Sequence, residues 1–291
     1  MTAGAAGDGR TGGGPGTATP PRSAARDGHP NGTGSSVMGV VRSEWTKFRS
    51  IRATVLLIAG ALAVSGFYSL LFSTAAARDY AAATAADRAA FDPAVPAFRG
   101  LFLVQLLVSA VGVLTVTSEY ASGTMRPSTT AVPRRGRLLA GKSVVAALVL
   151  LPSGTVIALV SFLVSQAVLA AQDTPSMALS DAGVPGAIAG AGLFLTLIGL
   201  YGVALGFLLR RTAGAVSLGS FLLLTPGMAS LFPEGLARWM VKYWPDAAGA
   251  QIFAIHPQAE GLAPVAGLGV LVATVTALLW AALAVFRGRD V

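Results

Sequence analysis

The sequence predicts an all-α membrane protein with six transmembrane helices. Of its 291 residues, 54% are hydrophobic and only 12% are charged, whereas a soluble chain carries about 25% charged residues. The charges lie in short clusters between long uncharged stretches. Six of these stretches are long enough for a helix of roughly 20 residues, which crosses a hydrocarbon core about 30 Å thick.

Residues 1–36 differ in composition from the rest of the chain. Gly, Ala, Thr, Pro and Ser dominate, and no hydrophobic periodicity is present. We expect a disordered cytoplasmic tail, followed by a six-span transmembrane domain over 37–291.

An amphipathic helix is expected at the start of that domain. Val41, Trp45 and Phe48 recur at helical spacing, with Arg and Lys at the positions between them. Such a helix lies at the membrane interface, where anionic lipid attracts its basic face. A simple basic anchor next to the membrane explains the same spacing, so both interpretations stay open.

The six apolar segments contain no Asp, Glu, Lys, Arg or His. We therefore expect no ion pair or proton relay within them, and an intramembrane enzyme lacks the paired acidic or histidine groups that it needs. The fourth segment holds two GxxxG pairs, Gly186 with Gly190 and Gly202 with Gly206, which favour close helix packing or arise by chance in a glycine-rich chain. The predicted spans are 53–73, 100–117, 143–169, 184–209, 213–232 and 265–286.

The basic residues set the expected orientation. With the amino terminus inside, 16 of the 21 Lys and Arg residues lie on the inner side and five on the outer side. Both termini are therefore expected in the cytoplasm. This distribution explains the net charge of +8 without a nucleic-acid partner, and none is expected.

The last outer connection, about 233–264, has two open interpretations. Leu236, Trp239, Met240 and Tyr243 follow helical spacing. This pattern fits a short amphipathic helix on the outer leaflet. It fits equally an aromatic belt that anchors a loop.

Metal and nucleotide sites are not expected on this chain. It has no Cys, and its two His residues, His29 and His256, are too few for a histidine metal site. Residues 136–143, GRLLAGKS, match the phosphate-binding pattern G-x-x-x-x-G-K-S, but that motif needs a preceding buried strand and a following helix on a sheet. Here a membrane span follows, so we interpret Lys142 as a basic residue at the inner membrane surface.

A second pattern occupies the same connection, between the second and third spans. The string SEYASGT at 118–124 is followed by Pro133 and by RGRLLAGK at 135–142. This arrangement resembles the first cytoplasmic connection of type-2 ATP-binding-cassette (ABC) transporter permeases, and the resemblance, closest to actinobacterial members, extends from about residue 38 to 291. The positions that match the family pattern are Glu119, Gly123, Thr124, Pro133, Gly141 and Lys142.

The resemblance implies a permease subunit of an ATP-driven ABC exporter in the cell membrane, acting as a homodimer or with a paired permease on an amphipathic or apolar substrate. It also implies that this chain is not an enzyme and holds no cofactor or metal, because a separate cytoplasmic ABC ATPase subunit binds ATP and Mg. The alternative is a non-transporting membrane subunit of an ABC-type signalling or resistance complex.

In this family a short coupling helix after the second span contacts the ATPase subunit. The residues expected to make that contact are Glu119, Tyr120, Gly123, Thr124 and Arg126. Their chemistry is consistent with it, since the Glu119 carboxylate can pair with a basic residue of the partner or of the entry helix, and Gly123 permits a tight bend. The residues alone also allow a simpler interpretation, in which Glu119 caps the next helix and the arginines fix topology.

Overall fold

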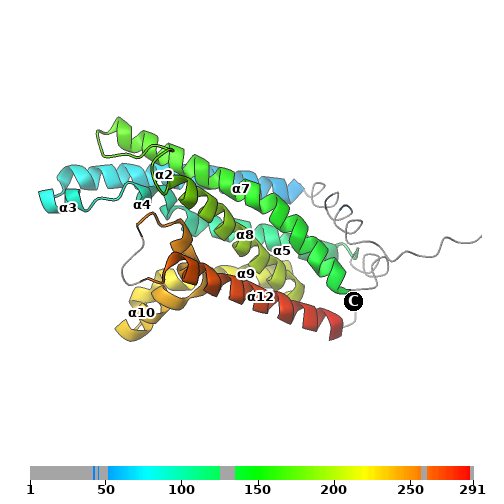
Figure 1. The fold of residues 1–291 in the computed structure, drawn as a ribbon. Helices are drawn as coiled ribbons and strands as arrows, with labels where there is room; N and C mark the ends of the chain where they lie inside the picture. Colours follow the sequence, from blue (N-terminus) through cyan, green and yellow to red (C-terminus); the bar gives the residue numbers. More distant parts are fainter. Residues whose placement is uncertain (1–41, 43–44, 46–51, 125–134, 257–260, 289–291) are drawn as a thin grey trace, which may run out of the picture. The chain divides into compact units, whose positions relative to one another are not determined.

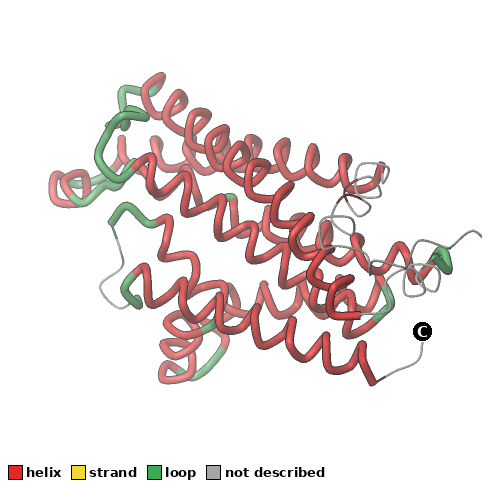
Figure 2. Tube along the Cα trace, turned by 45° about the vertical axis from the view of Figure 1, so that its right-hand side comes forward, coloured by secondary structure: helices red, strands yellow, loops and turns green. Residues whose placement is uncertain are grey.

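The computed structural model describes residues 42, 45, 52–124, 135–256 and 261–288. These residues form helices joined by loops, and no strand occurs among them (Figures 1 and 2). The tail at 1–36 and most of the amphipathic entry helix lie outside the described residues. Of the entry helix, Arg42 and Trp45 are helical and exposed.

Six helices are long and apolar enough to cross a membrane, as the sequence predicted. Helix α8 has the predicted limits, and each of the other five extends beyond its predicted limits at one end or both. Their bounds are α2 (Arg52–Ala82), α4 with α5 (Ala94–Arg99 and Leu101–Ala121), α7 (Arg135–Ala171), α8 (Val184–Leu209), α9 continued by the 3-10 helix η1 (Thr212–Leu224 and Thr225–Leu231), and α12 (Pro264–Gly288).

Helix α8 is the centre of the bundle. In the most apolar stretch of α8, 78% of the residues are buried inside the protein, against 17% in the corresponding stretches of α2 and α12. Helix α8 packs on α5, α7, α9 and α12 (Figure 1). Because a helix that is apolar all round must be covered by protein or lipid, α8 provides the surface on which the other spans assemble.

Glycines allow α5 to approach α8 closely. A Cβ atom added at Gly202 would overlap the backbone of Ser109 in α5, and one added at Gly206 would lie 3.0 Å from Val116 Cβ. A Cβ at Gly186 would contact nothing within 4 Å. One of the two predicted GxxxG pairs is thus a packing site, while Gly186 of the other faces open space.

Helices α2 and α7 are joined by a row of serines. The Ser69 and Ser161 hydroxyls lie 2.7 Å apart, and the Ser73 hydroxyl donates to the Ser165 hydroxyl at 2.7 Å. Ser65 donates to a carbonyl of α7 one turn earlier. Small hydroxyl residues let helices approach and satisfy each other's hydrogen bonds where water is absent.

The last outer connection contains helix α10 (Glu234–Tyr243), so the helical interpretation of this region holds. Met240 is buried, whereas Leu236, Trp239 and Tyr243 are exposed. Helix α11 (Pro245–Gly249) and the 3-10 helix η2 (Ala250–Phe253) follow and pack against α12 and α8. The chain therefore folds back into the bundle after α10 rather than running across its surface.

The glycine contact gives a first testable prediction. Gly202→Ala should lower the free energy of unfolding by about 1–3 kcal/mol, because the added methyl overlaps α5. Gly186→Ala is the matched control in the same helix and should be neutral or slightly stabilising, since Ala favours helix over Gly. Thermal unfolding of the two purified variants in detergent checks this. Equal melting temperatures would mean that α5 and α8 do not meet through this face.

Candidate functional site at the inner end of the bundle

A buried ion pair lies where α5 ends and α7 begins, an end that we call the inner end. Lys142 Nζ is 2.8 Å from Glu119 Oε1, and the two side chains are 3% and 9% exposed. The same ammonium group donates to the Thr115 carbonyl at 3.2 Å. A buried pair of charges is tolerated when further hydrogen bonds satisfy it, and here the backbone of α5 provides one.

The sequence did not indicate this pair. Lys142 is 4% exposed and sits between α5 and α7. Glu119 pairs with Lys142 of this chain, a partner additional to the basic residues of the entry helix or of a partner subunit that we considered. Both residues lie just beyond the predicted limits of the spans, and the helices that carry them run past those limits.

Tyr120 links this pair to the next inner connection. The Arg210 guanidinium lies 5.4 Å from the centre of the Tyr120 ring, at the distance of a cation–π contact. Arg210 ends α8 in the left-handed conformation with φ 55°, and its N–H donates to the Gly206 carbonyl. Arg210 directly follows the predicted fourth span, and nothing in its local sequence indicates Tyr120 as its neighbour.

The chain turns sharply directly after α5. Gly123 has φ +71°, a conformation that favours glycine, which confirms the expected bend. Thr124 Oγ1 lies 2.9 Å from Ser122 Oγ. Residues 121–124 are exposed, and we call them the inner turn. Arg126 and most of the expected coupling helix lie outside the described residues.

The phosphate-binding pattern at 136–143 forms no loop. All of these residues lie within α7, so the backbone amides from Leu139 onward are used by the helix, and the segment is not the loop before a helix that surrounds a phosphate. In the described part of the chain, no group of three or more His, Cys, Asp and Glu side chains is placed to hold a metal ion.

Comparison of this chain with protein-family models and with curated proteins finds no significant match. The inner-end site is thus defined by its geometry: a buried charge pair behind an exposed turn. This arrangement can hold a helix end rigidly while presenting a short surface to another molecule.

The ion pair gives a second prediction. Glu119→Leu and Lys142→Met should each lower the free energy of unfolding by about 3–5 kcal/mol, because each removes the 2.8 Å contact between two buried charges. The double variant Glu119→Leu with Lys142→Met should recover most of that loss. Thermal or denaturant unfolding in detergent measures all three.

The control for this cycle is Glu234→Gln, which removes an exposed carboxylate paired at 3.9 Å with Arg238. Exposed pairs contribute little, so no clear change is expected. If the double variant loses as much stability as the two single variants together, the two buried charges do not stabilise each other.

Proposed function

We propose that this chain is the membrane-spanning subunit of an ATP-driven ABC exporter, with ATP and Mg bound by a separate cytoplasmic ATPase subunit. In this proposal both termini and the inner turn face the cytoplasm, and the protein acts in the cell membrane as a homodimer or with a paired permease. An amphipathic or apolar compound is the substrate.

The observation that carries the proposal is the rigid support of the inner turn. The turn follows directly on Glu119 and Tyr120, which are held by Lys142 of α7 and by Arg210 at the end of α8. When another subunit moves this turn, the attached helices move with it only if the turn and the helix ends do not deform first. Helices anchored by buried ionic contacts meet that requirement.

The distribution of charge supports the same orientation. The inner turn lies at the end of the bundle where α7 and α12 carry Arg137 and Arg287 and where the α8–α9 connection carries Arg210 and Arg211. An excess of Arg and Lys marks the cytoplasmic side of a membrane protein. The sequence of residues 118–124, Ser-Glu-Tyr-Ala-Ser-Gly-Thr, ends in the inner turn and also resembles the type-2 ABC permease pattern at this position.

The test uses a matched pair of exposed alanines that end two helices. Ala121 ends α5 in the inner turn, and Ala82 ends α2 at the opposite end of the bundle. Ala121→Trp should reduce the recovery of an ATP-hydrolysing subunit with the tagged chain, and the stimulated ATPase rate, by about tenfold, because a bulky side chain blocks the contact. Ala82→Trp should change neither.

Equal recovery and equal ATPase stimulation in the two variants would contradict the proposed contact. The absence of any ATP-hydrolysing subunit with the unaltered chain would contradict the proposed function itself. Recovery of the subunit without flux of any compound would favour the non-transporting alternative.

A further inference from the structure

A cavity of about 380 Å³ lies at the other end of the bundle, between α9 and α12. Ile198 and Tyr201 of α8 form its floor, and the α10–α11 segment closes it on the outer side. Helices α9 and α12 both pack on α8 but make little contact with each other. The volume lies within the range of ligand sites, about 300–1,000 Å³.

One buried carboxyl group lines this cavity. Asp246 of α11 is 5% exposed, and it is the one charged residue among the described residues of the lining. Burial raises the pKa of its carboxyl to about 7, against the lowering effect of hydrogen bonds from the backbone and from Gln105. A carboxylate in an apolar cavity lacks a counter-charge, and a bound cation would supply one.

The polar groups next to Asp246 have more acceptors than donors. Gln105 of α5 is 1% exposed, and its Nε2 lies 3.4 Å from both Asp246 Oδ2 and the Leu223 carbonyl. No described residue donates to Gln105 Oε1. The Gln105 NH2 group is thus shared between the Asp246 carboxylate and the Leu223 carbonyl, and besides it only backbone N–H groups of the described residues donate to the carboxylate, so the site favours a positively charged occupant.

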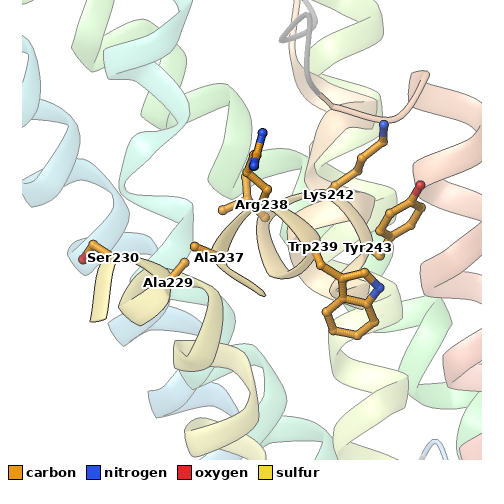
Figure 3. Close-up of a pocket in the computed structure, with 8 residues that line it drawn as sticks. Ala229, Ser230, Ala237, Arg238, Trp239, Lys242 and Tyr243 are labelled. Atoms are coloured by element: carbon orange, nitrogen blue, oxygen red, sulfur yellow. The ribbon is translucent and has the colours of Figure 1, made fainter. Parts of the chain in front are cut away.

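Aromatic rings form the wall beside the carboxylate. Tyr201, Trp239, Tyr243 and Trp244 all line the cavity, and the Trp244 indole donates to the Leu222 carbonyl at 2.9 Å, which fixes that ring. Figure 3 shows a neighbouring pocket that shares Trp239 and Tyr243 with this cavity; Arg238 and Lys242 point to one side of α10 and Trp239 to the opposite side. Arg238 and Lys242 do not line the cavity itself, although Lys242 Nζ lies 5.6 Å from the centre of the Tyr243 ring. Trp239 and Tyr243 of α10 do line it, and aromatic faces attract organic cations.

The cavity is reached from the side of the bundle. Its wall residues Trp239 and Tyr243 are 50% and 43% exposed, and Val270, Thr274 and Leu278 of α12 are half-buried. A molecule dissolved in the outer half of the membrane would meet this opening directly, so an apolar ligand need not cross water to enter.

We propose that this cavity binds a hydrophobic organic cation, with an ammonium or phosphonium centre beside Asp246 and its apolar groups among the aromatic rings. Binding is a property of the chain itself. The further step, that such a cation is the exported compound, rests on the proposed function.

Equilibrium binding of radiolabelled tetraphenylphosphonium to the purified full chain in nanodiscs of uncharged lipid tests the proposal. Measured at about pH 8, above the pKa of the carboxyl, Asp246→Asn should weaken binding at least about tenfold, because the counter-charge is lost. The matched control Asp79→Asn removes an exposed carboxylate from α2 and should leave binding unchanged. Triphenylphosphine oxide, which is uncharged, should bind the Asp246→Asn variant and the parent chain alike.

A second variant keeps the proposal testable if Asp246→Asn does not fold. Thr274→Phe fills the cavity from α12 while retaining the carboxylate, and it should abolish binding of both compounds. Unchanged tetraphenylphosphonium binding in either folded variant, or an equal loss in Asp79→Asn, would overturn the proposal. The assay contains no ATPase subunit, so its failure would leave the proposed function intact, and loss of the ATPase contact would leave cation binding intact.

Discussion

The close approach of α5 to α8 is the contact on which the rest of the bundle depends. In lipid there is no hydrophobic force to bring two apolar helices together, so packing must come from shape. Glycines supply that shape: a Cβ atom added at Gly112 of α5 or at Gly202 of α8 would overlap the backbone of the other helix, and one added at Gly206 of α8 would crowd Val116. Once α5 is fixed on α8, the polar residues that α5 carries are fixed as well.

Helix α5 carries polar residues of both sites described above. Gln105 contacts Asp246 near the outer cavity, and Glu119 contacts Lys142 at the inner end. Fourteen residues separate them in one unbroken helix, a rise of about 21 Å. If the proposed function holds, a displacement of the inner turn along the axis of α5 would move Gln105 relative to Asp246, because both polar residues belong to the same helix.

The sequence predicted the membrane class, the six spans and the bend at Gly123 because these follow from local patterns, namely apolar runs and a glycine after a helix. It did not predict the partner of Glu119, because Lys142 is 23 positions away and no local pattern indicates that the two side chains meet. Nothing in the local sequence singled out Asp246 as a site residue. Its burial depends on Gly190 and Gly267, which admit the backbone of the 246–253 segment between α8 and α12, and such a tertiary fit leaves no periodic signal in the sequence.

The central claim is that the inner turn faces the compartment that contains the ATPase, and the sidedness of Thr124 tests it most directly. The chain has no cysteine, so Thr124→Cys and Glu234→Cys each introduce a single thiol at an exposed position, one at each end of the bundle. With a membrane-impermeant maleimide, the account predicts labelling of Thr124→Cys in inside-out vesicles only and of Glu234→Cys in intact cells. Labelling of Thr124→Cys in intact cells would contradict the account.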